Sequence, residues 1–499
     1  MRQITDSRRA ANLKPYLNLL VYLLLAIAPA VVWNGAFPLD DAYITMSNAR
    51  VLLTGTDPYY ATSALTGATS GVHLALLALL GLLMPIPVAL MAISVASAFA
   101  YLWGLDVLVR KVGASRWKVP VLVLTGYTVG TVPHLLMNGL ETGMAMAAVT
   151  WLLVLADDRR LAYLAGISVY VRPELGVLAA LLMLRQIWHL PRGEAIKRVA
   201  IAALAASPWA IWYVVELGTP LPNTMAAKAA FFNHELWRIE FRIALFLMAL
   251  IEFRFLPIFL GFLGLPRVRG GWAALGFVLI FLAVALTEMP GALNWNFGRY
   301  MAVLVPPMVL GLARLSGERG GSALLVVVSV VCASGLPGNW ESLQKVRSDF
   351  AAEEIATRRV LAQLPVGSIL LVHDAGLPAW VQPKARLVDV VGLKTPSSIM
   401  SHKQWTRDMC HWGKAEDEIA RRAHASHFLV LKMYFWECLS KNLRDEGWKL
   451  KPMVSGTSEY QLFELTAPTP SARLDTAKPT HPASNSSVGA ENDARTTLP

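Results

Sequence analysis

The chain has 499 residues, of which 55% are hydrophobic and only 16% charged, and its formal net charge is +11. Soluble proteins carry roughly 25% charged residues, so this composition excludes an ordinary soluble protein and indicates one whose solvent is largely a bilayer. No basic–aromatic patch or nucleic-acid motif accompanies the positive charge, which excludes nucleic acid as the expected partner; membrane topology explains the excess.

Hydrophobic runs follow one another through the first two thirds of the chain. A spanning helix needs about 20 apolar residues, with a range of roughly 17–25. We expect eleven spans, several of them short, near residues 16–33, 86–109, 119–134, 142–156, 161–172, 174–190, 199–216, 241–265, 272–288, 300–314 and 322–337. The first has no small-residue cleavage site after it, so it is interpreted as a retained span and not as a signal peptide.

Basic residues orient these spans, because Lys and Arg collect on the cytoplasmic side of a membrane. Eighteen of them fall in the segments assigned to the cytoplasm and five in the short outer segments, which places the N-terminus inside the cell. Residues 71–83 are apolar but short, and we expect them to lie on the outer surface. Residues 241–265 carry Glu252 and Arg254 at mid-depth, where charges are typically paired or line a cavity.

The composition changes after residue 337. A charged segment of helical period is followed by short apolar runs, SILLVHD, RLVDVVGL, HFLVLKM and YQLFEL, which are typical of β-strands. We therefore expect a transmembrane domain in residues 1–337, an outer soluble α/β domain in residues 338–466 and a disordered tail in residues 467–499. Cys410 and Cys438 would form a disulfide in an oxidising compartment or remain thiols; the sequence leaves both open.

Polar residues of the outer loops are the candidates for function. The stretch AFPLDDAYITMSNARVLLTGTDP, residues 36–58, places two adjacent carboxylates, Asp40 and Asp41, in the first outer loop, residues 34–85, which we expect to be catalytic. The other candidates come from the same loop and from four further outer segments: His73, Glu141, Arg172, Asn223, Lys228 and Arg299. Because all outer turns meet at one face of a bundle, we expect these side chains to converge beside the outer leaflet.

This set of residues suits a reaction on a charged lipid headgroup. Arg and Lys supply the hydrogen-bonding cations that a lipid phosphate needs. An exposed Asp, with a pKa of about 3.9, is ionised at neutral pH and can act as the base for an attacking sugar hydroxyl. Two carboxylates with a third from another loop would instead hold a divalent metal such as Mg or Mn. The sequence leaves these two roles open and indicates no other cofactor.

The candidates also have structural interpretations. Asp40 precedes a plausible helix that ends at Gly55, so it would serve as an N-cap, with Asp41 favoured by the helix dipole. Adjacent helical residues point about 100° apart, so one Asp can cap while the other faces a cavity. Arg172 and Arg299 would be anchors at the ends of spans.

Several segments together resemble the GT-C class of polytopic glycosyltransferases, which use polyprenyl-phosphate sugars as donors. LDDAYITMSNARVLLTG is similar to the acidic first-loop motif of that class and NGLETGM to a second-loop segment; VRPE, PLPNTMAAK and FGRYMAVLVPP follow in the same order. VHDAGLPAWVQPKARLVDVVGLKTP resembles the outer-domain segment of the polyprenyl-phosphate-arabinose-dependent arabinofuranosyltransferases of cell-wall assembly.

The resemblance implies a polytopic α-helical protein of the bacterial inner membrane that transfers a sugar, with arabinofuranose as one candidate, to a glycan, glycolipid or protein acceptor outside the cytoplasm. Asp40 matches the first acid of the family motif and would be the base or would orient the acceptor hydroxyl. Asp41 falls where relatives carry a second acidic residue. Glu141, Lys228 and the two arginines fall at donor-facing positions. The first loop departs from the family in the stretch TSALTGATSGVH, where relatives often carry aromatic residues. This difference bears on acceptor specificity more than on the chemistry.

A transporter or lipid flippase is the alternative, with the carboxylates as ion sites. Transporters usually carry ionisable residues at mid-membrane and show internal repeats. Here the acids are expected at the outer surface and no repeat is present, so only Glu252 and Arg254 favour transport.

Overall fold

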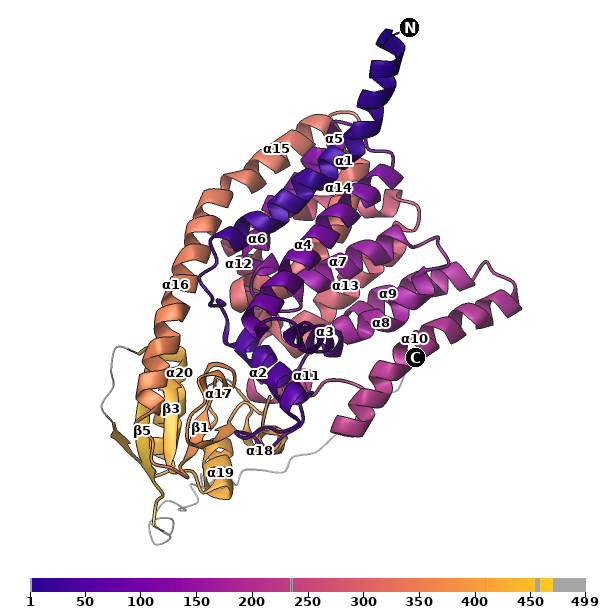
Figure 1. The fold of residues 1–499 in the computed structure, drawn as a ribbon. Helices are drawn as coiled ribbons and strands as arrows, with labels where there is room; N and C mark the ends of the chain where they lie inside the picture. Colours follow the sequence, from indigo (N-terminus) through magenta and orange to yellow (C-terminus); the bar gives the residue numbers. More distant parts are fainter. Residues whose placement is uncertain (1, 234, 236, 409, 454–457, 470–499) are drawn as a thin grey trace, which may run out of the picture.

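The computed structural model describes residues 2–233, 235, 237–408, 410–453 and 458–469. It is a bundle of helices with a small α/β unit, residues 369–466, at one end (Figure 1). The tail expected in residues 467–499 lies outside the described residues except for its first three positions.

The bundle contains both long and short helices. Its elements are α1 (Arg2–Val31), α2 (Asp40–Thr54), α3 (Gly71–Gly81), α4 (Ile86–Lys111), α5 (Lys118–Thr128), α6 (Val132–Leu136), α7 (Thr142–Val154), α8 (Leu161–Val171), α9 (Leu175–Ile187), α10 (Arg192–Leu217), α11 (Thr224–Phe231), α12 (Ile239–Glu252), η1 (Leu256–Arg267), α13 (Gly271–Glu288), η2 (Pro290–Asn294), η3 (Asn296–Leu304), α14 (Val305–Leu315), α15 (Gly321–Ser334) and α16 (Leu336–Leu361). The last two run along one side of the bundle and lead into the α/β unit (Figure 1).

Among the described residues, four helical stretches are long and apolar enough to cross a membrane: α4, α10, α13 and Gly321–Leu361. The pair α12 and η1 makes a fifth if it is counted as one bent span, and the other apolar helices are shorter. Several of the eleven expected spans are therefore built from short or broken helices, as 119–134 is by α5 and α6.

The span expected at 241–265 is broken in the structure. Helix α12 ends at Glu252, and η1 leaves it at an angle of 109°. Arg254 lies at the break with φ of +57°, and no ion pair joins it to Glu252 among the described contacts. The two charges that favoured a transporter therefore mark a helix end and do not form a mid-membrane pair.

The α/β unit is built on a five-stranded sheet in the order β2-β1-β3-β5-β4. The parallel strands β1, β2 and β3 form its buried half, and β5 runs antiparallel to both β3 and β4. The elements are β1 (Ile369–Val372), α17 (Leu377–Trp380), β2 (Arg386–Asp389), α18 (Pro396–Trp405), α19 (Gly413–Ala423), β3 (His427–Leu431), α20 (Tyr434–Asp445), β4 (Lys449–Pro452) and β5 (Tyr460–Thr466). The four apolar runs contain β1, β2, β3 and β5, whereas β4 is too polar to show in the pattern.

Cys410 and Cys438 are both free thiols in the structure. Cys410 Sγ lies 3.9 Å from the carbonyl oxygen of Phe435, on the helix that carries Cys438.

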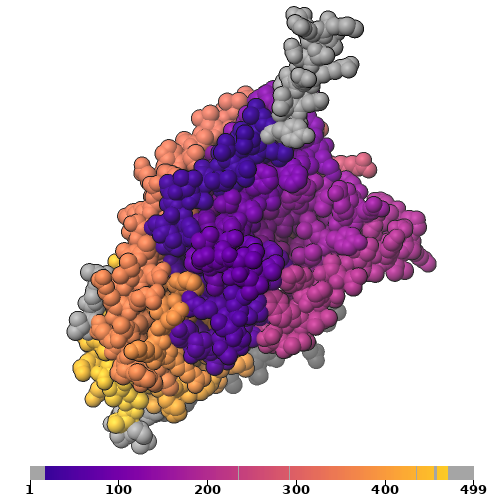
Figure 2. All heavy atoms as spheres, in the orientation of Figure 1, coloured from indigo at the N-terminus to yellow at the C-terminus, as the bar shows by residue number. Residues whose placement is uncertain are grey.

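The first loop connects the bundle to the α/β unit. Helix α2 ends at Gly55, whose φ of +78° suits glycine, and its first turn lies against α17. A Cβ at Gly376 would stand 2.2 Å from the carbonyl oxygen of Asp40, so only glycine permits this approach. In the space-filling view the purple atoms of the first loop lie directly against the orange atoms of the α/β unit (Figure 2).

Candidate active site

The two adjacent carboxylates have different environments. Asp40 accepts hydrogen bonds from the backbone N–H groups of Gly376, at 2.9 Å, and Leu377, at 2.6 Å. It therefore caps α17, which is more than 330 residues away in the chain, and makes no side-chain cap on its own helix. Burial raises the pKa of Asp40 well above its usual value, the neighbouring Asp374 carboxylate raises it further, and the two N–H groups act in the opposite direction.

Asp41 points to the other side, toward two cations. Its Oδ2 atom lies 2.7 Å from Arg299 Nη2 and 3.2 Å from Lys228 Nζ. Burial alone would raise the pKa of Asp41, but the positive charges of Lys228 and Arg299 outweigh it and hold the pKa well below its ordinary range. Because adjacent helical residues diverge by about 100°, one Asp faces the α/β unit and the other faces the bundle.

Arg299 is delivered by an unusual turn at the start of η3. Asn296, Phe297 and Gly298 have φ of +50°, +62° and +70° in succession, a left-handed conformation that costs about 1 kcal/mol or more at each of the two non-glycine positions. The turn directs Arg299, which is only 3% exposed, onto Tyr300. The guanidinium carbon lies 5.0 Å from the tyrosine ring centroid, and Nη2 donates to the hydroxyl at 3.2 Å.

Arg172 reaches the same ring from the end of α8. Its guanidinium carbon lies 5.1 Å from the Tyr300 ring centroid, Nη2 lies 2.6 Å from Glu174 Oε1, and Nε lies 3.7 Å from Glu141 Oε1. The side chain is 2% exposed, yet its Nε and Nη1 atoms have no hydrogen-bond partner within the described part of the chain, and the same holds for Arg299 Nε. Buried guanidinium donors without acceptors are costly, so this corner favours an anionic ligand.

Two cavities meet at these cations. The smaller and more polar one is lined by Asp41, His73, Glu141, Lys228 and Arg299, among others. The larger one, of about 250 Å³, shares Glu141, Lys228 and Arg299 with it and continues as a groove. The far wall of this groove is one apolar face of α13, formed by Phe277, Ile280, Phe281 and Val284.

The structure brings together most of the candidates from the sequence. Asp41, His73, Glu141, Arg172, Lys228 and Arg299 line one or both cavities. Asp40 lines neither. Asn223 is also apart, because its amide accepts from Gly67 N at 3.1 Å and donates to Leu393 O at 3.0 Å, which ties three segments together.

Three features of the site escaped sequence reasoning. Tyr300 sits between the two arginines, although FGRY shows only an aromatic residue beside a cation. The sequence places Glu174 beside Arg172 at the turn of a short hairpin, but it does not predict their ion pair, because a spacing of two positions occurs in any turn. The lining of the groove by α13 has the helical spacing of every lipid-facing or core helix, so no local signal distinguishes it.

The residues at hand do not fit a divalent metal. Within the described residues no three His, Cys, Asp or Glu side chains are grouped as metal ligands. Asp41 is moreover already held by two cations.

A helical bundle with several helices apolar enough to cross a membrane, acidic and basic side chains from separate loops at one end, and a small α/β unit packed on the first loop make up an architecture similar to the GT-C membrane fold. No family model matches the chain, and no curated protein matches it in sequence. Two crystal structures of ArnT from Cupriavidus metallidurans share its fold. The match to the apo form covers 91% of this chain and 98% of ArnT. The match to the form bound to undecaprenyl phosphate covers 90% of this chain and 97% of ArnT. Each has a TM-score of 0.53 at 12% sequence identity.

The arabinofuranosyltransferase AftD from Mycobacteria, determined by cryo-EM, covers 91% of the chain with a TM-score of 0.47 at 16% identity. This chain spans 40% of the length of AftD. The resemblance to GT-C glycosyltransferases inferred from the sequence is confirmed at the level of the fold, by the ArnT structures.

Proposed function

We propose that the chain is a membrane glycosyltransferase that takes a sugar from a polyprenyl phosphate at the outer face of the bacterial inner membrane. The acceptor is a glycan, glycolipid or protein outside the cytoplasm, and arabinofuranose is the sugar favoured by the resemblance of VHDAGLPAWVQPKARLVDVVGLKTP to a segment of arabinofuranosyltransferases. The N-terminus lies in the cytoplasm and the α/β unit outside. Residues 1–337 form the membrane domain, residues 338–466 the outer domain and the first loop, residues 34–85, the catalytic loop.

The observation that carries this proposal is a groove that is apolar along its length and cationic at its end. A polyprenyl chain gains about 0.8 kcal/mol for each CH₂ group it buries, and the α13 face offers such a wall. The phosphate then meets Arg172, Lys228 and Arg299, and the buried N–H groups of the two arginines that have no hydrogen-bond partner among the described residues match its oxygens. The ArnT structure bound to undecaprenyl phosphate supports a donor of this kind.

Charge balance assigns a role to Asp41. The three cations face three carboxylates, Asp41, Glu141 and Glu174. A phosphate that accepts hydrogen bonds from Lys228 and Arg299 competes with Asp41 for them. Once Asp41 loses these partners, its pKa rises toward the ordinary value, and its carboxylate becomes a better base. Donor binding thus activates the base.

The transfer follows from this arrangement. The acceptor hydroxyl gives its proton to Asp41, and its oxygen forms the new bond to the anomeric carbon. The bond between that carbon and the phosphate oxygen breaks, and the electron pair stays on the phosphate, whose added charge Arg172, Lys228 and Arg299 stabilise. Asp40 fixes the start of α2 on α17 and so positions Asp41.

The direct test supplies purified protein in nanodiscs with radiolabelled polyprenyl-phosphate sugars and a mixture of cell-envelope acceptors. Label in an acceptor, lost in Arg299→Ala but kept in the exposed variant Arg319→Ala, supports the proposal. Movement of intact labelled lipid between leaflets without transfer would establish a flippase instead.

A further inference from the structure

A third cavity, of about 260 Å³, lies on a neighbouring face of α2. Its walls are one side of α2, the loop at 56–60 that follows it, and residues 375–382 around α17. Within the described part of the chain, Ile44 is the one residue that lines both this cavity and the polar cavity of Asp41, and no lining residue of this cavity also lines the donor groove. The cavity is therefore separate from the proposed donor site, one helix face away.

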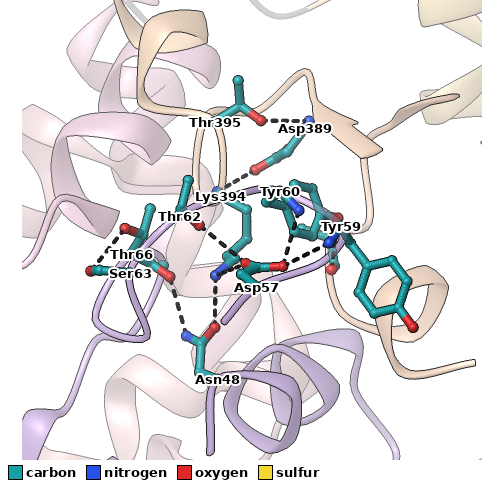
Figure 3. A network of polar contacts seen from close by, with 12 residues as sticks. Asn48, Asp57, Tyr59, Tyr60, Thr62, Ser63, Thr66, Asp389, Lys394 and Thr395 are labelled. Atoms are coloured by element: carbon teal, nitrogen blue, oxygen red, sulfur yellow. Dashed lines mark hydrogen bonds and ion pairs between the residues drawn. The ribbon is translucent and has the colours of Figure 1, made fainter. Parts of the chain in front are cut away.

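The floor of this cavity is a fixed polar network (Figure 3). Lys394 Nζ lies 3.2 Å from Asp57 Oδ2 and donates to Asn48 Oδ1 at 2.8 Å. Asp57 Oδ1 also accepts from the backbone N–H groups of Tyr59 and Tyr60, both at 3.0 Å. These groups satisfy one another, and the ion pair leaves the floor without net charge. They shape the cavity and hold the loop against the α/β unit.

Three other polar side chains on the walls make no hydrogen bond or ion pair with another described residue. The Oγ atom of Ser47 is buried and has no hydrogen-bond partner within the described residues. The Arg50 guanidinium stacks over the Trp380 ring, 4.2 Å from its centroid, and no carboxylate in the described part of the chain pairs with it. Gln382 holds a φ of +59°, a backbone strain that is often retained where a side chain serves a ligand.

These walls suit a polyhydroxylated ligand. A sugar ring presents hydroxyls that both donate and accept, and apolar C–H faces that pack on aromatic rings. The cavity offers a serine hydroxyl, an amide and a guanidinium edge as partners, with Tyr59 and Tyr60 as rings. Among the described residues, Arg50 is the one cation of this cavity without an ion-pair partner, whereas a phosphate site commonly gathers several, as the donor site does.

We propose that this cavity binds a saccharide unit of the acceptor and so presents the next hydroxyl of that glycan to Asp41. The inference rests on the proposed transferase function. Ala375 lines the cavity, and the following residue, Gly376, donates to Asp40, so the cavity and the catalytic loop share one rigid frame. The acceptor class is then a glycan or glycolipid, and the α/β unit contributes part of its binding site.

The experiment measures saccharide binding in the absence of any donor. Purified full-length protein in detergent is titrated, by saturation-transfer NMR, with methyl glycosides and disaccharides of arabinofuranose, mannose, galactose and glucose. At least one probe should bind the wild type with a millimolar Kd. Arg50→Ala and, separately, Ser47→Val should weaken that binding at least tenfold, whereas Leu52→Ala, an exposed position on α2 that lines neither cavity, should leave it unchanged.

Asp41→Asn should bind the same saccharide as the wild type, because the cavity does not include Asp41. Failure of every probe to bind, equal binding by Arg50→Ala and the wild type, or displacement of the saccharide by inorganic phosphate would overturn the inference. Binding of undecaprenyl phosphate is measured in parallel. Its absence in the wild type would refute the transferase proposal while saccharide binding still reports on this cavity.

Discussion

Replacement of Asp41 by Asn should separate catalysis from donor binding. Asp41 lies 2.7 Å from Arg299 and 3.2 Å from Lys228. At an effective dielectric constant of about 20 these contacts attract by about 6 and 5 kcal/mol before desolvation is counted. Removing one partner of a buried ion pair costs about 3–5 kcal/mol of stability, so the variant should melt at a lower temperature but remain folded in the membrane.

The two functional readouts should move in opposite directions. Loss of the base should lower the rate of transfer by about 10²- to 10⁴-fold. The affinity for polyprenyl phosphate should be retained or rise, by up to about tenfold, because Lys228 and Arg299 no longer bind a competing carboxylate. Added phosphate lipid should also raise the melting temperature of the variant more than that of the wild type.

The assay combines transfer of label from a polyprenyl-phosphate sugar with titration of undecaprenyl phosphate followed by intrinsic tryptophan fluorescence. Asp158→Asn is the control, since Asp158 is an ion-paired carboxylate that lines none of the three cavities. If Asp41→Asn transfers sugar at the rate of the wild type, or binds the phosphate lipid more weakly, then Asp41 is not a base released by the donor.

Three further predictions address the groove, the cap and the pH dependence. Ile280→Ala, in the groove, should weaken the binding of long-chain polyprenyl phosphate about fivefold and leave the binding of inorganic phosphate unchanged. Leu279→Ala, at the adjacent exposed position, should change neither affinity. If titration shows equal effects for the two variants, the groove is not the lipid site. Asp40→Asn should lower the free energy of unfolding by about 1–3 kcal/mol in thermal melts. It should also lower the rate of sugar transfer and leave the affinity for phosphate lipid unchanged. Weaker lipid binding by this variant would place Asp40 in the donor site. Burial raises the pKa of Asp389 to about 6 from 3.8. The folded state therefore binds more protons between about pH 4 and 6, and stability should fall by up to about 3 kcal/mol as the pH rises through this window. Melting curves of Asp389→Asn should show a smaller fall in stability across this window than those of the wild type, because Asp40 also has a raised pKa and still contributes; an unchanged or steeper fall would contradict the assignment.

Much of the architecture follows from local patterns. Long apolar runs and the distribution of basic residues predict a helical membrane protein, because a bilayer demands continuous apolar helices. Alternating apolar runs predict four of the five strands. The break after Glu252 and the strand at Lys449–Pro452 do not follow, since a helix bend leaves the hydrophobicity unchanged and a polar edge strand resembles a loop.

The sequence by itself determined which chemical groups this protein carries into its loops: an acidic pair, a further glutamate and three cations. Only the tertiary structure decided which of these groups contact one another and which cavity each of them lines. It joined Asp40 to backbone N–H groups at Gly376 and Leu377, Asp41 to Lys228 and Arg299, and the apolar face of α13 to the cations. The physical reason is that composition and periodicity report whether a residue is buried, whereas its charge partner and its cavity depend on segments that are distant in the chain and meet only through packing.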